Sequence, residues 1–173
     1  MRIWNQALGH PRALNLAGAL TCIGLVVAAV IIEVVADMPP CPLCVFQRVA
    51  FLVMAAFLLL GAIRPGWLAG GLTAVAALAG IGLAWRHLWL QSLPPEEVPA
   101  CGPGLDYLLE VFPLSEALRL VLSGSGECAE IDRILGVTIP AWTLLAYGLL
   151  GGFFLLFNAA VARQRAPSRQ APS

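Results

Sequence analysis

Four long stretches of the chain are apolar and free of charge: Leu14–Ile32, Val49–Ile63, Trp67–Trp85 and Ile139–Ala162. A helix needs roughly 20 apolar residues to cross the hydrocarbon core of a bilayer, within a range of about 17–25. The second stretch reaches this length only when it is counted from about Leu43, which places Arg48 inside it. The pattern predicts four transmembrane helices, over residues 14–35, 43–63, 67–87 and 139–162.

The composition argues against a soluble protein. Of the 173 residues, 60% are hydrophobic and 12% are charged, whereas soluble domains contain about 25% charged residues. Helices that are apolar on all faces cannot be covered in a soluble bundle of this size, so we expect an all-α membrane protein. The first stretch is longer than a signal-peptide core of about 7–15 residues and lacks a convincing cleavage site, so we interpret it as a retained span.

The arginines predict how the spans are oriented, because cytoplasmic ends of membrane proteins are rich in Lys and Arg. Six of the ten arginines fall on the side that holds both termini: Arg2, Arg12, Arg64, Arg163, Arg165 and Arg169. All ten acidic residues fall on the other side. We predict a single domain over residues 1–162 with cytoplasmic termini, outer loops at 36–42 and 88–138, and a disordered cytoplasmic tail at 163–173.

Four of the five cysteines fall on the outer side. Cys41 and Cys44 belong to the first outer loop, and Cys101 and Cys128 belong to the second. We expect this compartment to be oxidising, and disulfides persist in such an environment. The fifth cysteine, Cys22, lies in the middle of the first span, where we interpret it as a small buried hydrophobic residue without a functional role.

The stretch PPCPLCVFQR, residues 39–48, places a C-x-x-C motif where the second span begins. Pro42 suits the first position of a helix, which puts Cys44 in the first turn, where the helix dipole stabilises a thiolate. Arg48 follows four residues later on the same face and should favour that thiolate further. An arginine at this depth either snorkels to the headgroups or marks a functional site. Beside the motif we favour a cation that faces an electron-rich ligand dissolved in the bilayer.

Three functions are compatible with the C-x-x-C motif. A zinc site completed by Cys101 and Cys128 is disfavoured, because the second pair is not a C-x-x-C and the compartment is oxidising. A purely structural disulfide is the second alternative. We favour redox exchange and predict no metal, since a disulfide with one stabilised leaving thiolate is easily reduced.

The second outer loop is predicted to contain a short amphipathic helix. Leu114, Leu118, Val121 and Leu122 recur at helical spacing, with Ser115 as a candidate cap. We expect this helix either on the membrane surface or packed against the spans. Gly-Pro-Gly precedes it and Ser-Gly-Ser-Gly follows it, and such flexible flanks would let a cysteine pair change partners.

The motifs occur in an order that resembles one family. PCPLCVFQR, RHLWLQ at the end of the third span, a long loop with Cys101 and GECAE, and IPAW at the start of the fourth span together resemble the DsbB family of bacterial inner-membrane thiol–quinone oxidoreductases. The resemblance covers nearly the whole chain. It implies an enzyme with its active cysteines on the periplasmic side that reoxidises a DsbA-like thioredoxin-fold carrier. The electrons would pass through two cysteine pairs to ubiquinone or menaquinone.

The resemblance also implies a role for each outer cysteine. The reduced carrier would attack Cys101, whose partner in the loop disulfide would be Cys128. Cys128 would then pair transiently with Cys41. Cys44 would remain as the thiolate that faces the quinone.

Two further residues are implied to bind the quinone. Arg48 would polarise a quinone oxygen, and His87 matches a family position near the quinone by its place at the outer end of the third span. The expected partners are therefore the carrier, the quinone and membrane lipid, with no nucleic acid. We interpret Trp85, Trp89 and Trp142 as an outer aromatic belt, with a place in a quinone cleft as the less favoured role for Trp142.

Two other classes of protein remain alternatives at this stage. An enzyme similar to vitamin K epoxide reductase also uses four helices and outer cysteines, but that family places its C-x-x-C near the last span of the bundle. A membrane subunit without enzymatic activity, held by two disulfides, is the second alternative.

Overall fold

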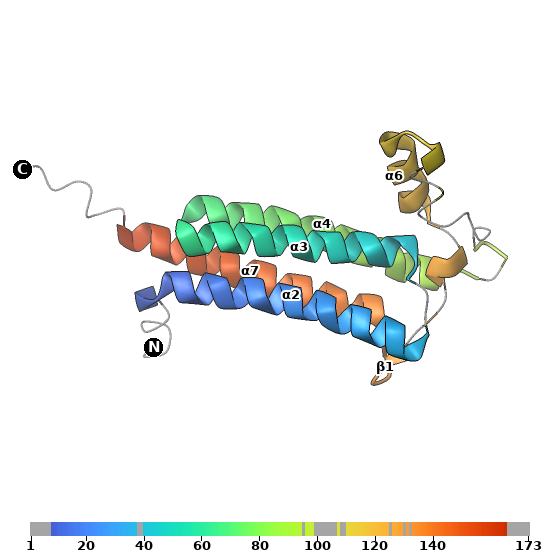
Figure 1. Ribbon diagram of the computed structural model, residues 1–173, viewed down its shortest axis with the longest axis horizontal. Helices are drawn as coiled ribbons and strands as arrows, with labels where there is room; N and C mark the ends of the chain where they lie inside the picture. The colour runs from blue at the N-terminus through green and yellow to red at the C-terminus, as the bar shows by residue number, and fades with distance from the viewer. Residues whose placement is uncertain are drawn as a thin grey trace, which may run out of the picture.

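The computed structural model of the chain describes residues 8–37, 40–94, 96–98, 107, 110–124, 126–129, 131 and 133–165. Four long helices lie side by side with alternating direction (Figure 1): α2 (Pro11–Ala36), α3 (Pro42–Ile63), α4 (Trp67–Gln91) and α7 (Ile139–Arg165). Each of the four is long and apolar enough to cross a membrane. The predicted all-α, four-span fold is confirmed.

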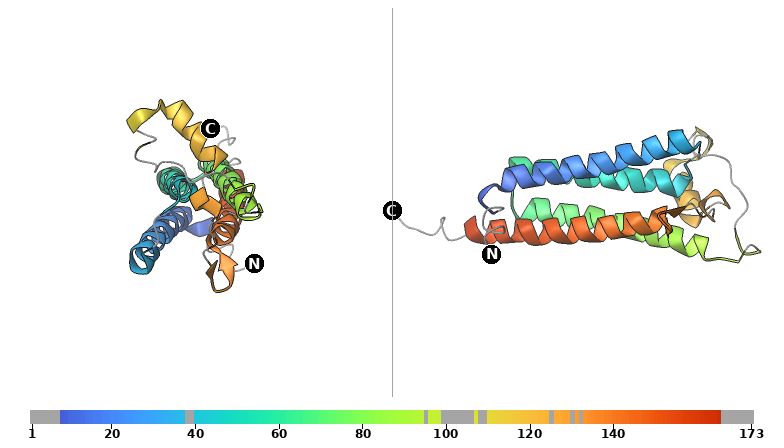
Figure 2. Two further views of the ribbon diagram at one scale, coloured as in Figure 1. Left: turned by 90° about the vertical axis from the view of Figure 1, so that its right-hand side faces the viewer. Right: turned by 90° about the horizontal axis from the view of Figure 1, so that it is seen from below.

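The helices pack as a chain of neighbours rather than as a closed ring. α2 packs along α3, α3 along α4, and α4 along α7, whereas α2 and α7 make little contact (Figure 2). Glycines allow the closest approaches: a Cβ at Gly80 of α4 would clash with the ring of Tyr147 on α7. The poorly closed side between α2 and α7 is the side on which the candidate site opens.

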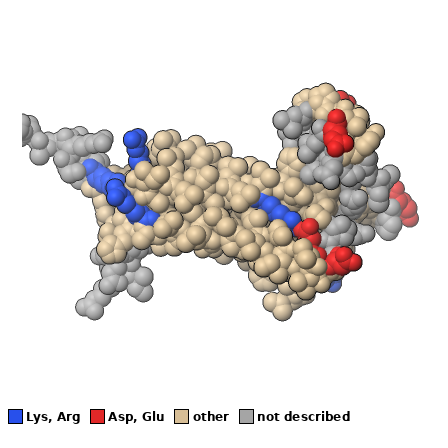
Figure 3. Space-filling model, in the orientation of Figure 1, with Lys and Arg blue, Asp and Glu red and all other residues tan. Residues whose placement is uncertain are grey.

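The two ends of the bundle differ in charge. α2 begins and α7 ends at one end, together with the turn that joins α3 to α4 (Figure 1). On the face drawn in Figure 3, arginine side chains gather toward this end and acidic side chains toward the opposite one. We call the opposite end, where α3 begins and α4 ends, the outer end, following the orientation predicted from the arginines.

The last helix is longer than predicted. α7 continues through Arg165, so residues 163–165, which we expected to be disordered, are helical. Arg163 and Arg165 lie in its last turn, where cations interact favourably with the helix dipole. Arg165 Nη1 also donates a hydrogen bond to the Pro65 carbonyl at 3.0 Å. The remainder of the predicted tail, residues 166–173, lies outside the described residues.

Small elements cover the outer end. They are α6 (Leu114–Ser123), the 3-10 helix η1 (Gly126–Ala129), and an antiparallel hairpin of β1 (Arg133–Ile134) and β2 (Val137–Thr138). α6 falls on the segment for which the sequence predicted an amphipathic helix. The predicted cap was wrong, because Ser115 lies inside α6 and the cap position is held by Pro113. The extended conformation of Pro113 already leads into the helix, with Glu116 N–H donating to its carbonyl at 2.9 Å.

α6 is attached to the bundle by one arginine of α4. Arg86 donates from Nε to the Leu122 carbonyl at 3.0 Å and from Nη2 to the Ser123 carbonyl at 2.8 Å. A cation is favourable at this end of a helix, where the carbonyls have no partners within the helix. Val121 of α6 is buried in the same apolar cluster as Leu90. Val121 is the one buried residue among the described side chains of α6. The helix therefore contacts the spans at its last turn, and the placement of the remainder on the membrane surface stays a prediction.

Among the residues that the structure describes, the core consists of two apolar clusters. The larger one fills the middle of the bundle and includes Cys22, which is fully buried as predicted. The smaller one closes the outer end and consists of Cys41, Leu43, Leu90, Val121 and Cys128. Two of the outer cysteines are therefore core residues of the layer that separates the spans from the loops.

Candidate active site

The C-x-x-C motif lies where α3 begins. Cys41 is the N-cap residue, with φ −68° and ψ 156°, and Pro42 is the first residue of the helix. The Cys44 N–H donates to Cys41 Sγ at 3.3 Å, and the two sulfur atoms lie 2.8 Å apart. A small movement is enough to convert this pair between two thiols and a disulfide. Cys44 lies in the first turn, as the proline pattern predicted.

A third cysteine completes a buried sulfur cluster. Cys128 comes from η1, is fully buried, and belongs to the same apolar cluster as Cys41. Hydrogen bonds with the side chains of Cys128 and Cys44, together with burial, raise the pKa of the Cys41 thiol well above its usual range. The structure thus brings three of the four predicted catalytic cysteines together. Cys101, the fourth, lies outside the described residues.

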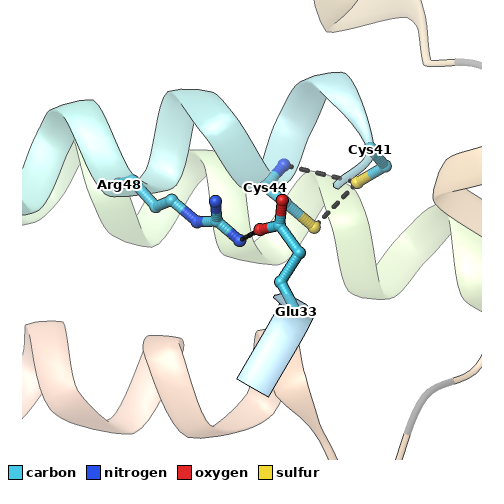
Figure 4. A network of polar contacts seen from close by, with 4 residues as sticks. All are labelled: Glu33, Cys41, Cys44 and Arg48. Carbon is cyan, nitrogen blue, oxygen red and sulfur yellow. Dashed lines mark hydrogen bonds and ion pairs between the residues drawn. The ribbon is translucent and has the colours of Figure 1, made fainter. Parts of the chain in front are cut away.

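Arg48 is held by an acidic residue that the sequence analysis did not single out. Its guanidinium forms an ion pair through Nη2 with Oε2 of Glu33, which lies near the end of α2 (Figure 4). Both side chains are about four-fifths buried, with exposed fractions of 21% and 23%. The signal in the sequence was an acid that interrupts an apolar run just before the helix ends, and we had counted it only among the outer acidic residues.

His87 lies next to the motif, on α4. Its Nε2 is 3.9 Å from Cys41 Sγ, and its Nδ1 is 3.2 Å from Nε2 of Gln47. The Thr143 hydroxyl donates to Oε1 of Gln47 at 2.7 Å, which leaves the amide nitrogen to donate to the imidazole. Neutral His87 then carries its proton on Nε2, the nitrogen that faces the sulfur of Cys41.

Gln47 organises this part of the site, and the sequence analysis missed it. It is 4% exposed, and its backbone carbonyl accepts a hydrogen bond of 2.5 Å from the Tyr147 hydroxyl of α7. The Tyr147 ring is stacked on Phe51 of α3, with centroids 4.0 Å apart. Gln47 and Thr143 are polar residues inside apolar runs, and this was the one signal that could have identified them.

A cavity of about 470 Å³ opens beside these residues, between α2, α3 and α7. Its wall is mostly aliphatic and aromatic, and it includes Trp142, for which the sequence favours an aromatic belt over a place in a quinone cleft. Its polar wall is formed by Glu33, Cys44, Gln47, Arg48, His87 and Thr143. A mostly apolar cavity with a few convergent polar groups is the usual form of a small-molecule site.

The same residues could also hold a metal ion. The ligand atoms of Cys41, Cys44 and His87 lie within 4.8 Å of one another. Sulfur and imidazole nitrogen are the ligands that zinc prefers. The absence of a metal therefore stays a prediction from the sequence.

The fold and the sulfur cluster are those expected of one class of protein, a multi-pass membrane thiol–disulfide oxidoreductase. Residues 11–157 match the family of Disulfide bond formation protein DsbB. The chain is 49% identical over 142 residues to Disulfide bond formation protein B of Chromohalobacter salexigens, covering 78% of this chain and 83% of the relative. It is 44% identical over 159 residues to the protein of the same name from Methylococcus capsulatus, covering 87% and 96%.

The chain belongs to the DsbB family. The resemblance found in the sequence is confirmed, and the chain is a disulfide bond formation protein with several membrane spans. This membership favours the redox interpretation of the C-x-x-C motif over a structural disulfide. It also disfavours both alternative classes of protein that the sequence left open.

Proposed function

We propose that the protein is a disulfide oxidase of the bacterial inner membrane. It reoxidises a DsbA-like thioredoxin-fold carrier in the periplasm and passes the electrons to ubiquinone or menaquinone. The observation that carries the proposal is the cavity of about 470 Å³, whose wall contains Cys44, Arg48 and His87 together. A redox-active sulfur, a cation and an imidazole thus line one apolar space.

The residues around the cavity fit a quinone. A quinone is a flat, apolar ring with two carbonyl oxygens. Arg48 offers N–H donors suited to such an oxygen, and the imidazole of His87 lines the same cavity. Leu145 and Leu149 line the cavity and also have exposed fractions of 52% and 64%. Since such outward apolar surfaces face lipid in a membrane span, a lipid-soluble molecule can approach from the bilayer.

The sulfur cluster supports the relay of electrons within the chain. The carrier's thiolate would attack Cys101, which breaks the disulfide with Cys128 and frees the Cys128 sulfur. Cys128 then attacks Cys41, which breaks the inner disulfide and releases Cys44 as a thiolate. The second thiolate of the carrier displaces Cys101, and Cys101 attacks Cys128, which closes the loop disulfide again and releases Cys41 as a thiol. The hydrogen bond between the Cys41 and Cys128 side chains supports this exchange.

The direction of electron flow requires a strongly oxidising acceptor. DsbA-type carriers are known strong oxidants with potentials of about −120 mV, so an ordinary disulfide cannot easily reoxidise them. When the Cys41–Cys44 bond closes again from the two thiols, two electrons and two protons leave the pair, and a bound quinone supplies the acceptor for both. Arg48 would stabilise the Cys44 thiolate and donate to a carbonyl oxygen.

Purified protein with a reduced thioredoxin-fold carrier and a soluble quinone tests the proposal, with loss of quinone absorbance as the readout. The Cys44→Ser variant should lose quinone reduction and still trap the carrier through Cys101 as a mixed disulfide. Cys22→Ser is the matched control and should keep turnover, because Cys22 lies in the central core away from the cavity. Full turnover by Cys44→Ser would overturn the proposed mechanism.

A further inference from the structure

Glu33 is the one acidic residue of the described part of the chain that lines the cavity. We propose that Glu33 is a positioning residue, which holds the Arg48 guanidinium at the cavity wall and partly neutralises its charge. In this way Glu33 sets the reactivity of Cys44 toward the electron acceptor. The inference rests on the proposed function for its consequence, but its central claim concerns residues of this chain alone.

Placing the Glu33 carboxylate inside a membrane span is energetically unfavourable unless the carboxylate is paired. Glu33 lies on α2, a predicted span, and its side chain is 23% exposed. Charged residues inside a span generally mark functional sites. Asp37, four residues later, lies at the end of the same helix and is exposed. The chain therefore places one acid in the solvent-accessible position and the other against Arg48.

The ion pair restrains the Arg48 guanidinium but uses only some of its N–H donors. The contact joins Nη2 of Arg48 to Oε2 of Glu33, whereas a guanidinium has five N–H donors. Donors therefore remain for a carbonyl oxygen in the cavity. In Figure 4 the Glu33 carboxyl group points toward the Arg48 guanidinium. Because Glu33 comes from α2 and Arg48 from α3, the pair also joins two helices at the cavity.

Glu33 counteracts the effect of Arg48 on Cys44. An adjacent cation favours a thiolate, typically lowering a pKa by about 1–3 units, and an adjacent anion opposes it. The groups around Cys44 that can carry charge are Arg48 from its own helix, Glu33 from α2, His87 from α4, and the thiols Cys41 and Cys128. Glu33 is the carboxylate of this set, so removing its charge should leave the cation unopposed.

A partly neutralised cation suits a thiolate that must also react. The intrinsic nucleophilicity of a thiolate falls as its pKa falls, with a Brønsted coefficient of about 0.4–0.5. Arg48 alone would keep Cys44 ionised but less reactive. With Glu33 in place, Cys44 can be ionised at neutral pH and still give up its electrons readily.

The test is the pKa of Cys44 in the reduced full-length protein without quinone, measured from the pH dependence of its alkylation and read by mass spectrometry. Glu33→Gln removes the charge and keeps a side-chain oxygen for Arg48, so it should lower this pKa by about one unit. Glu33→Ala should lower it by less, because it also releases the guanidinium. Asp37→Asn is the matched control on the same helix and should leave the value unchanged. Using two Glu33 variants guards against one that fails to fold. An unchanged or raised pKa in the variants that fold would overturn the inference.

Quinone turnover supplies the second readout. A pKa lowered by one unit corresponds to a roughly threefold lower kcat in Glu33→Gln at a Brønsted coefficient near 0.5, with a smaller change in KM. The two readouts distinguish a failure of the proposed function from a failure of the role proposed for Glu33. If the wild-type protein reduces no quinone, the proposed function is wrong, although the alkylation shift can still be measured. If turnover is normal and the pKa of Cys44 does not move, only the role of Glu33 is wrong.

Discussion

In the described part of the chain, buried polar side chains form two clusters between helices, one near each end of the bundle, and the clusters differ in what their polar atoms face. Near the end where α2 begins, Asn15 and Asn158 are both fully buried and form reciprocal hydrogen bonds of 3.3 Å and 2.9 Å between α2 and α7. Each amide also donates to a carbonyl of its own helix, at 2.8 Å and 3.0 Å. We call these two residues the closed pair.

At the outer end, Gln47, His87 and Thr143 form a second cluster, which we call the open cluster. Gln47 and His87 are as deeply buried as core residues, at 4% each. All three residues line the cavity, and His87 also faces a cysteine sulfur. The closed pair joins two helices and leaves little capacity for a ligand. Burial alone therefore does not separate structural from functional polar residues in this protein, whereas the presence of a cavity does.

The largest effect should come from the same substitution made at two cysteines, Cys41 next to the open cluster and Cys22 in the central apolar core. Cys41→Ser should lower turnover by more than about 1,000-fold, because the thiol–disulfide exchange needs this sulfur. Cys22→Ser should keep turnover and lower the free energy of unfolding by about 1–3 kcal/mol, since it buries a hydroxyl in the apolar core. Quinone reduction and unfolding in detergent measure the two effects. Substantial turnover by Cys41→Ser would show that the cysteine next to the open cluster is no more important for turnover than the cysteine in the central core.

The next effect concerns the open cluster itself. Gln47→Leu removes the hydrogen bonds to His87 and Thr143, so the imidazole loses the partner that fixes its tautomer. We expect kcat/KM for the quinone to fall about tenfold, as when other groups that orient a functional side chain are lost. Stability should change little, because leucine fills the space and the Thr143 hydroxyl also donates to the Pro140 carbonyl at 2.9 Å. A kcat/KM equal to that of the wild type would remove Gln47 from the functional site.

A smaller effect is expected for the closed pair, and on stability alone. Asn158→Ala should lower the free energy of unfolding by about 1 kcal/mol. In a double-mutant cycle with Asn15→Ala, the coupling energy should be about 0.6 kcal/mol and at most about 1.7 kcal/mol, as for other hydrogen bonds between membrane helices. Turnover per folded molecule should stay unchanged. A loss of turnover in Asn158→Ala without unfolding would show that the pair is not purely structural.

The features that could be predicted from the sequence are those that depend on the pattern of residues along a single helix. The four spans follow from charge-free runs, and the placement of Cys44 and Arg48 follows from a proline at the first helical position and a spacing of four. Along one helix the geometry is fixed by 3.6 residues per turn. These features need no knowledge of how the helices pack against one another.

Contacts between helices could not be predicted in this way. The pairing of Glu33 with Arg48 depends on how α2 is rotated against α3, and the role of Gln47 depends on Thr143 from α7. No periodicity along one helix contains that information. The burial of Cys128 likewise requires η1 to fold against the outer end, and this depends on the contacts of η1 with α4 and α3.

The smallest effect should be on the reactivity of Cys41. Its pKa is raised first by the hydrogen bond with Cys128, then by that with Cys44, and then by burial. A raised pKa in the folded state means that Cys41 stays a neutral thiol at neutral pH and that its alkylation accelerates only as the pH rises. Because this pKa is higher in the folded state than in the unfolded state, the free energy of unfolding of the reduced protein should fall as the pH rises above about 8.5, the ordinary pKa of a thiol.

Cys128→Ala removes the hydrogen bond that raises the pKa of Cys41 most, so we expect roughly threefold faster alkylation of Cys41 at fixed pH. Cys22→Ala should leave this rate unchanged, and equal rates in the two variants would mean that Cys128 does not act on Cys41 in the reduced protein.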